Sequence, residues 1–308
     1  MGKVLVFGSF VVDLMARSSH LPTPGETVRG SLFKMGPGGK GFNQCVAAHK
    51  AGADVKMITK LGSDTFANIA LDTMTELEMS QDYVFISETE KTGCALILVD
   101  EATSQNEIII VPGACDTFID SEIQSLENEI KDSEYLLLQL EVNQDANEKI
   151  ADIANKYGCK VIVNTAPYSK LSDSFFSKVY MVTPNEIEAE EITGVPVTDL
   201  QSAHKAAEYF YDRGVKKVII TLGSKGVFVS SDGTETIVPA YHVNAVDTTG
   251  AGDAFNGGLL AALSKGKDIW EAVQFANALA ALSVQKLGTT PAMPLLNDIN
   301  RFIEENPI

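Results

Sequence analysis

The chain has 308 residues, of which 45% are hydrophobic and 21% are charged, so it can build one large α/β domain or two smaller ones. Its formal net charge is −17, which argues against a nucleic-acid or anionic-membrane partner because both are themselves negatively charged. No linker, internal repeat or low-complexity segment interrupts the sequence. We therefore predict a single globular domain over residues 1–308.

The cysteines and the N-terminal segment bear on the compartment in which the protein works. The cysteines are far apart in sequence and none forms a C-x-x-C, so free thiols are expected. Residues 1–8 lack the long apolar region and the small-residue cleavage site of a secretory signal peptide. No run approaches the ~18 apolar residues of a membrane span. We expect a cytoplasmic protein.

Short apolar runs alternate with longer runs that have the period of an amphipathic helix. The predicted strands are Val4–Phe7, Val55–Thr59, Tyr135–Leu140, Lys160–Val163, Val179–Val182 and Val218–Leu222. The predicted helices are Phe42–Ala51, Ala67–Leu77, Gln144–Tyr157, Glu186–Thr193 and Ser202–Arg213, followed by a mostly helical region from Gly250 to Glu305. This alternation is typical of a doubly wound α/β fold, a mostly parallel central sheet with helices on both faces.

Two segments interrupt the alternation. Residues 14–37 are rich in Pro, Gly and Thr, and residues 93–112 contain two β-like runs, Cys94–Val99 and Glu107–Val111, around a polar turn. Neither segment has room for a crossover helix, so both are expected to add antiparallel strands outside the main sheet. A small sheet made from the two segments could act as a lid that excludes water from a site. The alternative is a pair of hairpins without a functional role.

The segment Asp247–Asp253, with sequence DTTGAGD, places two glycines and an aspartate where a helix-period run begins. A glycine-rich turn that opens a helix leaves backbone N–H groups free, and the helix dipole adds positive potential, so the segment suits a phosphate. The carboxylate of Asp253 would repel an anion bound there. Its presence indicates that it accepts a proton from the group that attacks phosphorus. A capped helix with an acidic first turn is the alternative interpretation.

A second glycine-rich segment, Gly36–Asn43 with sequence GPGGKGFN, leads into another helix-period run. It combines close backbone approach with Lys40 and with the amide of Asn43, which suits a polyhydroxylated ligand or a phosphate. Lys40 is followed by Gly rather than Ser or Thr, so this is not a Walker A loop, and the G-x-G-x-x-G spacing of dinucleotide sites is missing. A flexible helix entry is the alternative.

Polar residues also stand at the ends of several predicted strands. Asn185 and Glu188 share one face of a helical turn and could hold water on Mg²⁺, although a helix cap explains the same pair. The other residues of this kind are Asp13, Glu141, Thr221 and Gly223. Ligands of open α/β sheets bind at the carboxyl ends of the strands, so we expect these groups to converge on one edge of the sheet.

Together these motifs closely resemble those of the ribokinase-like (PfkB) carbohydrate kinase family. The segments that carry the resemblance are Gly38–Gln44, Asn185–Glu188 and Asp247–Asp253, with Leu21–Thr27 and Gln139–Glu141 in support. The G-G-K-G-x-N-Q form is typical of the ribokinase branch, and the resemblance covers essentially the whole chain. It implies transfer of the γ-phosphoryl group of ATP, with Mg²⁺, to a sugar hydroxyl, for ribose the 5-hydroxyl. It also implies a homodimer formed through the β lid.

The resemblance gives each matching residue an expected role. Asp253 would be the catalytic base, and the amides of Gly250, Ala251, Gly252 and Asp253 would form an anion hole. The sugar would be contacted by Asp13, Gly39, Lys40, Asn43, Glu141 and Asp247. The nucleotide site would be lined by Asn185, Thr221, Gly223 and Asn277, and Glu188 would hold Mg²⁺ through water. K⁺ would lie beside the anion hole within loops matched by Asp247, Thr249, Ser283, Lys286 and Gly288.

Three positions depart from the family pattern. Val11 stands where ribokinases often have Asn, two residues before the sugar-binding Asp, and Phe42 replaces the usual Ala. A lost amide removes one hydrogen bond to a sugar hydroxyl, worth about 0.5–1.5 kcal/mol, which shifts the choice of sugar without abolishing kinase chemistry. Ala292 stands where a Ser is usual in the K⁺ loops, which bears on K⁺ activation.

Several alternatives remain open at this stage. The same chemistry could act on another pentose, a ketohexose or a nucleoside. A nicotinamide-dependent oxidoreductase is suggested by the first strand and Gly8, against the missing G-x-G-x-x-G. A catalytically silent sugar-sensing protein is the third alternative, against which the intact Asp253 and its glycines argue.

Overall fold

The computed structural model describes residues 2–103 and 105–307 and contains two β-sheets. The nine-stranded sheet has the order β13-β12-β11-β10-β9-β8-β1-β4-β5, and the four-stranded sheet has the order β3-β2-β6-β7. The strands of the larger sheet are β1 Val4–Phe7, β4 Val55–Gly62, β5 Tyr83–Ser87, β8 Tyr135–Leu138, β9 Lys160–Val163, β10 Met181–Val182, β11 Lys217–Thr221, β12 Val227–Ser231 and β13 Thr234–Val238. Those of the smaller sheet are β2 Val11–Ser18, β3 Gly30–Gly38, β6 Thr92–Asp100 and β7 Asn106–Gly113.

The nine-stranded sheet is parallel from β11 to β5, and β12 and β13 add an antiparallel edge. The helices are α1 Lys40–Lys50, α2 Thr65–Glu76, α3 Asp120–Ser125, α4 Glu127–Lys131, α5 Gln144–Tyr157, α6 Asp173–Phe176, α7 Glu186–Thr193, α8 Leu200–Tyr211, α9 Ala251–Ser264, α10 Ile269–Ser283 and α11 Leu296–Glu305. The prediction of a doubly wound, mostly parallel sheet is confirmed.

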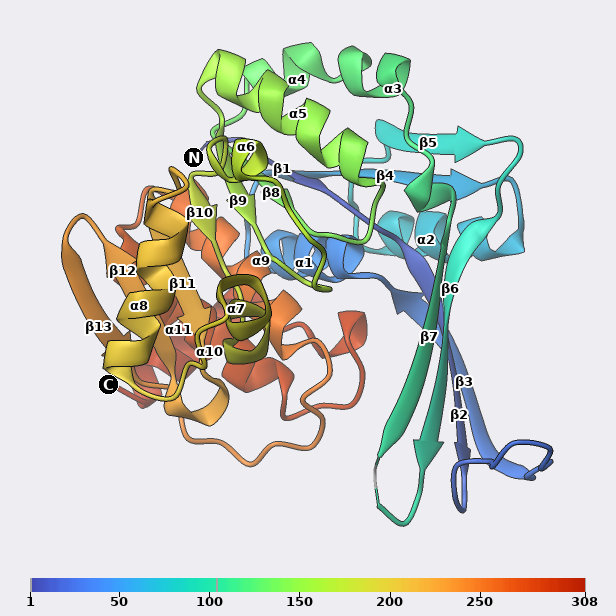
Figure 1. The fold of residues 1–308 in the computed structure, drawn as a ribbon. Helices are drawn as coiled ribbons and strands as arrows, with labels where there is room; N and C mark the ends of the chain where they lie inside the picture. The colour runs from blue at the N-terminus through green and yellow to red at the C-terminus, as the bar shows by residue number, and fades with distance from the viewer. Residues whose placement is uncertain (1, 104, 308) are drawn as a thin grey trace.

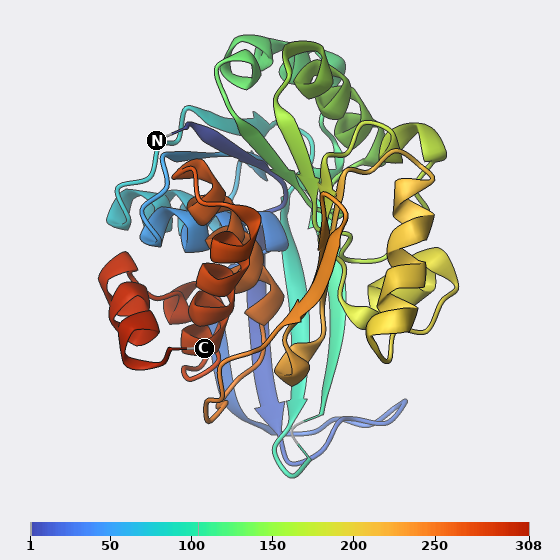
Figure 2. The same ribbon diagram turned by 90° about the vertical axis from the view of Figure 1, so that its left-hand side faces the viewer.

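The central strand β1 shows why helices cover both faces of this sheet. Val4 and Val6 pack into one hydrophobic cluster, which includes the apolar faces of α1, α9 and α10, whereas Leu5 and Phe7 pack into a second cluster with α3, α5 and α8. Successive strand side chains point to opposite faces, so an unbroken apolar run buries both sides of the sheet. Figure 2 shows the sheet between these two layers of helices.

The four-stranded sheet projects from the body of the molecule (Figure 1). Its strands come from the two segments that interrupt the helix–strand alternation, and each segment forms a hairpin, β2–β3 and β6–β7. Within each hairpin the strands are antiparallel, as predicted, and the two hairpins are joined by β2 and β6, which are parallel. Both strands follow a parallel strand of the main sheet, β1 and β5, and therefore leave the body in the same direction. The role of this sheet as a lid and the single-domain organisation stay predictions.

The predicted elements agree with the structure to within a few residues, but several shorter elements were not predicted. Strand β10 begins at Met181 rather than Val179, and strand β8 ends at Leu138 rather than Leu140. The sequence prediction omitted β5, β12, β13, α3, α4 and α6. The hairpin β12–β13 turns at Asp232 and Gly233, both with positive φ, and an Asp-Gly pair between β-like runs is the signal that would have identified it.

Candidate active site

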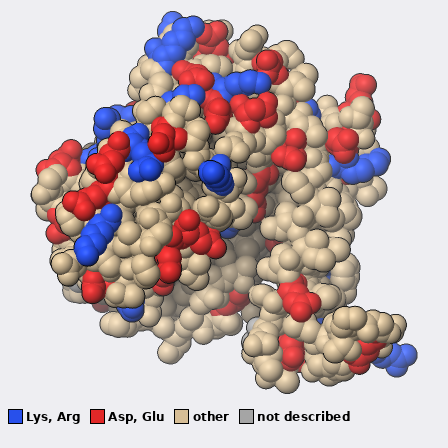
Figure 3. Space-filling view, viewed as in Figure 1, with Lys and Arg blue, Asp and Glu red and all other residues tan. Residues whose placement is uncertain are grey.

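Strand ends and helix N-termini meet at one edge of the nine-stranded sheet, beside the four-stranded sheet. The N–H of Lys40, at the start of α1, donates to Glu141 Oε2, which follows β8, at 2.9 Å. Asn43 of α1 donates to Asp253 of α9, and Asn185 pairs with Thr221 at the ends of β10 and β11. The space-filling view shows a hollow between the body and the four-stranded sheet with acidic side chains on its wall (Figure 3).

Gly250 is the N-cap of α9 and has a left-handed conformation, with φ 76°. Only glycine adopts this conformation without strain, and a Cβ there would also lie 3.1 Å from Thr289 Cγ2. No atom lies within 4 Å of the position that a Cβ of Gly252 would occupy. The N–H groups of Gly252 and Asp253 have no acceptor among the described residues, so the helix begins with free donors facing open space.

The Asp253 carboxylate is 6% exposed and is held by two side-chain amides of α1. Asn43 Nδ2 donates to Oδ2 at 3.0 Å, and Gln44 Nε2 donates to Oδ1 at 2.9 Å. Thr290 donates its hydroxyl to Asn43 Oδ1 at 2.9 Å, which turns the NH₂ group of Asn43 toward Asp253. Asp253 is therefore fixed at the edge of the free amides.

Asp13, on β2, faces the body across the hollow. Its pKa is raised from 3.8 to about 6 by burial first and then by the nearby carboxylates of Glu141 and Asp253. A Cβ on Gly38 would lie 2.2 Å from Asp13 Oδ1, so only glycine leaves room for this carboxyl beside β3. Asp13, Glu141 and Asp253 are thus brought close together, as the sequence predicted for polar groups at strand ends.

Lys40 and Gly39 complete this side of the site. Burial lowers the pKa of Lys40, but the negative charges of Asp253, Glu141 and Glu188 outweigh burial and raise it overall, so the ammonium group stays charged. Gly39 has φ 91°, and a Cβ there would lie 2.9 Å from Ser9 O. A cation among three carboxylates, with bare backbone beside it, is suited to hold the hydroxyls of a polar ligand.

Asp247 lies apart from this cluster. Its Oδ1 accepts from Thr249 N and its Oδ2 from Gly288 N, both at 2.9 Å, so its carboxylate joins two loops. Burial raises its pKa, but the hydrogen bonds from Gly288 and Thr249, with help from the charge of Arg17, outweigh burial and lower the pKa overall. Its predicted place in the K⁺ loops fits these contacts, whereas no contact joins it to Asp13 or Glu141 among the described residues.

The loops predicted for K⁺ are held by backbone bonds and by a lysine. Val246 N donates to Val284 O at 2.7 Å, and Ser283 Oγ donates to Ala280 O at 2.8 Å. Lys50 Nζ donates to the carbonyl oxygens of Thr290 and Met293, at 3.3 and 3.2 Å. Burial lowers the pKa of Lys50, and the charge of Lys286 lowers it further, so two ammonium groups lie near these loops.

The residues predicted for the nucleotide fall into two groups. Asn185, Thr221 and Gly223 are neighbours, since Asn185 pairs with Thr221 and Gly223 begins a 3₁₀ turn directly after β11. Asn277, on α10, instead donates its Nδ2 to Pro239 O at 3.1 Å. No contact joins Asn277 to the first group among the described residues.

Glu188 and Asn185 form a reciprocal cap at the start of α7. Asn185 Oδ1 accepts from Glu188 N at 2.8 Å, while Glu188 accepts from Asn185 N at 3.0 Å and Asn185 Nδ2 at 2.9 Å. Burial raises the pKa of Glu188 despite the hydrogen bond from Asn185 and the charge of Lys40. A carboxylate has about four lone-pair sites, so Glu188 keeps acceptors for water bound to a metal ion. Among the described residues no group of three His, Cys, Asp or Glu could hold a metal by itself.

Phe42 does not face the hollow. Its ring is fully buried and lies edge-on to Phe10, with centroids 5.0 Å apart, inside the hydrophobic cluster of α1 and α9. Val11, at the start of β2, is 3% exposed and lies close to Gly39. Phe42 thus places its side chain in the core, whereas Val11 lies against Gly39, a residue predicted to contact the sugar.

Gln44, Gln139 and Asn256 lie in segments that the sequence analysis considered but have no predicted role, and Asn164 and Thr290 were not predicted at all. All five side chains are buried and belong to hydrogen-bond networks around Asp253. Gln139 and Asn164 each follow a buried strand, so the strand-end rule that selected Glu141 would also have selected them.

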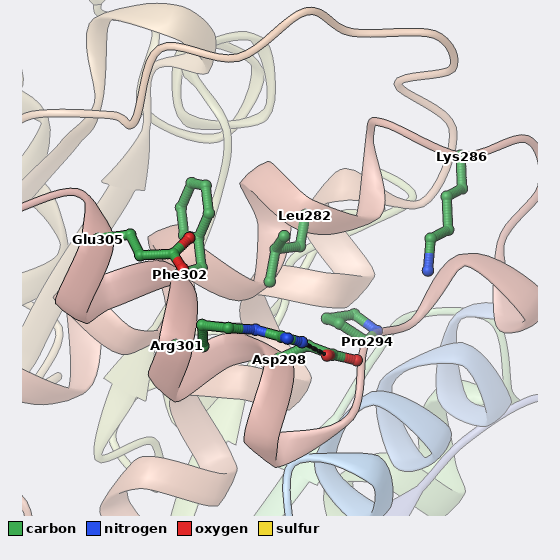
Figure 4. Close-up of a pocket in the computed structure, with 7 residues that line it drawn as sticks. All are labelled: Leu282, Lys286, Pro294, Asp298, Arg301, Phe302 and Glu305. Carbon is green, nitrogen blue, oxygen red and sulfur yellow. Dashed lines mark hydrogen bonds and ion pairs between the residues drawn. The ribbon is translucent and has the colours of Figure 1, made fainter.

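A cavity of about 250 Å³ lies between the ends of α10 and α11 (Figure 4). It is lined by Leu282, Lys286, Pro294, Asp298, Arg301, Phe302 and Glu305. Arg301 and Asp298, one turn apart on α11, form an ion pair in its lining, and Lys286 is the one lining residue that belongs to the predicted sites. None of the residues around Asp253 lines it.

In residues 2–103 and 105–307 no helix has the length and apolar character needed to cross a membrane.

Comparison with known proteins places this geometry in a family. A model of the pfkB family of carbohydrate kinases matches residues 1–296. The chain is 40% identical to a ribokinase from Haemophilus influenzae over 97% of each chain, and 35% identical to a deoxyribokinase from Salmonella typhi over 98% of this chain and 99% of that one. The structure matches that of Arabidopsis thaliana ribokinase complexed with ribose and ATP with a TM-score of 0.91, at 28% identity over 98% of this chain and 99% of that one. The chain belongs to the pfkB family of carbohydrate kinases.

Proposed function

We propose that this protein is a ribokinase, which transfers the γ-phosphoryl group of ATP to the 5-hydroxyl of D-ribose. The observation that carries the proposal is the start of α9, where two N–H groups without acceptors among the described residues lie beside a carboxylate held by two amides. The likeness to ribokinases from Haemophilus influenzae and Arabidopsis thaliana supports ribose as the substrate.

In the proposed reaction the sugar hydroxyl oxygen attacks the γ-phosphorus in line with the bond to the bridging oxygen of ADP. The new O–P bond forms as the bond to ADP breaks, and the hydroxyl proton passes to Asp253, so no phospho-enzyme arises. The amides of Gly250, Ala251, Gly252 and Asp253 would donate to the oxygens of the transferring group. Of these, the Ala251 amide donates to Thr248 O at 3.2 Å in this structure and would have to exchange partners.

The sugar would lie between β2 and the start of α1. Asp13 and Glu141 would accept from its hydroxyls, and Lys40, Asn43 and the backbone at Gly39 would donate to its oxygens. These groups lie beside one hollow and offer both donors and acceptors, as recognition of the hydroxyls of a neutral polyol requires. Asp247 belongs with the sugar only if its loop moves, because its carboxylate is bonded to Thr249 and Gly288.

ATP would lie along the ends of β10 and β11, against Asn185, Thr221 and Gly223, with Asn277 on the far side. Mg²⁺, when bound, neutralises charge on the phosphates. Glu188 would accept from its water molecules, using the lone pairs that the cap with Asn185 leaves free.

K⁺ fits the loops around Asp247, where Thr249, Ser283, Lys286 and Gly288 lie. The Asp247 carboxylate, which ties these loops together, would supply negative charge, and backbone carbonyl oxygens would supply further ligands. When bound, K⁺ would stabilise the loops next to the anion hole. The neighbouring ammonium groups of Lys50 and Lys286 would repel K⁺. Ala292 lacks the hydroxyl oxygen that a Ser at this position would offer as a ligand.

The four-stranded sheet is proposed to be a lid over the sugar and the interface of a homodimer. It carries Asp13 into the site and exposes large apolar side chains of β3 and β7, among them Phe33 at 65% and Ile109 at 63%. Exposed apolar surface of this kind marks interaction sites.

The four cysteines are free thiols, in keeping with work in the reducing cytoplasm.

The deoxyribokinase from Salmonella typhi makes 2-deoxyribose the second candidate substrate. Val11, beside Gly39, cannot form a hydrogen bond with a sugar hydroxyl. A sugar with fewer hydroxyls, such as 2-deoxyribose, would not need that bond. Another pentose, a ketohexose or a nucleoside would place different hydroxyls against Asp13 and Glu141. A sugar sensor without turnover and a nicotinamide-dependent oxidoreductase are the remaining alternatives.

The test is ADP release from ATP and Mg²⁺ with ribose, 2-deoxyribose, fructose and a nucleoside in turn, each with and without K⁺. We expect ribose to give the highest kcat/KM. A higher value with another sugar would replace ribose and keep the kinase. No sugar-dependent ADP release together with sugar binding would indicate a sensor, and reduction of a nicotinamide cofactor would indicate an oxidoreductase.

A further inference from the structure

Gln44, on α1, is completely buried and uses both hydrogens of its side-chain amide on two partners. Its Nε2 donates to Asp253 Oδ1 at 2.9 Å and to Asn164 Oδ1 at 3.0 Å. Gln44 therefore contacts the proposed base from the interior of the protein. It cannot contact the sugar, which is proposed to bind in the hollow.

The direction of these hydrogen bonds follows from the charge on Asp253. An ionised carboxylate only accepts, so Gln44 must turn its NH₂ group toward Asp253 and its Oε1 away. Oε1 then accepts from Gln139 Nε2 at 2.7 Å, which fixes the amide of Gln139 in turn. Gln139 Oε1 packs against Gly8, where a Cβ would lie only 1.9 Å away.

A second branch leads from Gln44 to the backbone of α9. Asn164 Nδ2 donates to Thr183 O at 3.1 Å, and Thr183 Oγ1 donates to Asn256 Oδ1 at 2.6 Å. Asn256 Nδ2 donates to Gly252 O at 2.9 Å, on the same peptide group that carries the free N–H of Asp253. The branch thus ends on the first turn of α9, beside Asp253, whose carboxylate Gln44 contacts directly.

This arrangement holds the carboxylate and the amide of Asp253 from two directions. Each polar side chain of the branch is at most 6% exposed, and burying such groups is unfavourable unless each finds its partner. Apolar side chains of the same volume would fill the space without that requirement. What the amides add is orientation, because each hydrogen bond fixes the direction of the next.

We propose that Gln44 is a positioning residue, which fixes the Asp253 carboxylate relative to the free amides at the start of α9. The proposal rests on the proposed function, since it assumes that Asp253 takes the hydroxyl proton. A displacement of about 1 Å in a reacting group costs about 100-fold in rate, so a loss of this contact should appear mainly in kcat.

The test is Gln44→Glu, which keeps the shape of the side chain and replaces the donating NH₂ with oxygen. When the introduced carboxyl is protonated it can still donate to Asp253, but when ionised it places a second negative charge against that carboxylate. The matched control is Asn147→Asp. Asn147 is 1% exposed and donates to the backbone oxygen of Gln139 at 2.9 Å, without touching Asp253.

The charged groups that face Asp253 are Asp13 from β2, Lys40 from α1 and Glu188 from α7. All three are unchanged in Gln44→Glu, so a new pH dependence belongs to the added carboxyl. We expect kcat of the variant to be about 100-fold below wild type at alkaline pH and to recover as pH falls. The wild type has no such recovery, because its base must be ionised, and KM for sugar and ATP should change less than kcat.

A role in packing alone predicts that Gln44→Glu and Asn147→Asp lose similar stability and keep the pH profile of the wild type, and that result would overturn the proposal. The titration of the Asp253 carboxyl, followed by NMR after selective ¹³C labelling of aspartate, gives a readout that needs no turnover. We expect it to change in Gln44→Glu and not in Asn147→Asp. An unchanged titration also overturns the proposal. A wild type inactive with every sugar contradicts the proposed function alone, because the NMR comparison still tests the positioning.

Discussion

The two sheets of the molecule treat their apolar side chains in opposite ways. In the nine-stranded sheet the inner strands are buried on both faces, as at the successive residues Leu136 and Leu137, which pack on opposite sides and have no exposed surface. In the four-stranded sheet Phe33 and Ile109 are more than half exposed. Helices complete the first sheet from within the chain, whereas the second sheet still has a face for another molecule to cover.

Two carboxylates of the site, Asp253 and Asp13, show a similar contrast between the body and the four-stranded sheet. Asp253, on the body, accepts two amide hydrogen bonds, whereas Asp13, on the four-stranded sheet, faces other carboxylates and has a pKa of about 6. The body side of the site is complete before the ligand arrives. In the proposed complex, a sugar would supply donors to Asp13 and so make the other side favourable. Changes on the body should therefore act on kcat, and changes on the four-stranded sheet should act on binding.

The largest effect is expected for Asp253→Asn. An amide cannot take the hydroxyl proton, so kcat should fall about 10³-fold while ATP binding, followed by calorimetry, stays within a few-fold of wild type. The matched control is Asp268→Asn at the N-cap of α10. Asp268 also accepts two hydrogen bonds, from Trp270 N and Glu271 N, but it follows the C-terminal end of α9, the end opposite Asp253. Near-normal turnover in Asp253→Asn would remove its role as the base.

Asp13→Asn should act on the sugar rather than on the chemical step. Loss of a charged acceptor is worth about 1.5–3 kcal/mol, so kcat/KM for the sugar should fall about 10–100-fold with a smaller change in kcat. In the wild type kcat/KM should rise with pH through about 6 as Asp13 ionises, and this rise should be missing in the variant. Initial rates at several pH values check both points, and a retained rise in the variant would contradict its assignment to Asp13.

The same substitution should raise stability. The folded-state pKa of Asp13 lies above its value of 3.8 in an unfolded chain, so the folded protein binds the proton more tightly. Stability is then lost as pH rises from 3.8 to about 6 and stays lower above that range. Asn cannot ionise, so the thermal midpoint of Asp13→Asn should exceed that of wild type above pH 6 and match it at acidic pH. A lower midpoint at neutral pH would contradict the raised pKa.

The comparison also explains what could be predicted from sequence. Val4–Phe7 was predicted to the residue because an apolar run that ends at glycine needs only local information. Asp253 and Asn43 were selected by motifs, and the structure places them in contact across 210 residues of sequence. The partners of Gln44 could not be predicted, because Gln139 and Asn164 lie 95 and 120 residues away and nothing in their own neighbourhoods indicates an amide partner.

The parallel pairing of β2 and β6 was not predicted, for a related reason. Each hairpin can be recognised locally, but how two hairpins pair depends on where the body strands β1 and β5 send them. The pairing brings β3 and β7 to the edges and leaves their apolar residues exposed. Local patterns therefore predict the elements, whereas the pairing of distant elements sets the surfaces.

A smaller effect is expected when the exposed face of the four-stranded sheet is charged. Phe33→Asp combined with Ile109→Asp should convert a dimer into a monomer, as measured by light scattering after size exclusion, and raise KM for the sugar several-fold while kcat stays near wild type. Leu295→Asp is the matched control, since Leu295 is 59% exposed on the body before α11. A wild type that is already monomeric, or a double variant that stays dimeric, would contradict this interface.

The smallest effect concerns K⁺ and the segment after Gly288. Lys50 Nζ already engages the carbonyl oxygens of Thr290 and Met293, and Ala292, buried between them, has no side-chain oxygen. K⁺ should therefore raise kcat only a few-fold over tetramethylammonium, with half-activation at a higher concentration than a serine at this position would give. Ala292→Ser should lower that concentration a few-fold and leave kcat at saturating K⁺ unchanged. If neither protein responds to K⁺, the ammonium groups of Lys50 and Lys286 already supply the positive charge that the loops around Asp247 require.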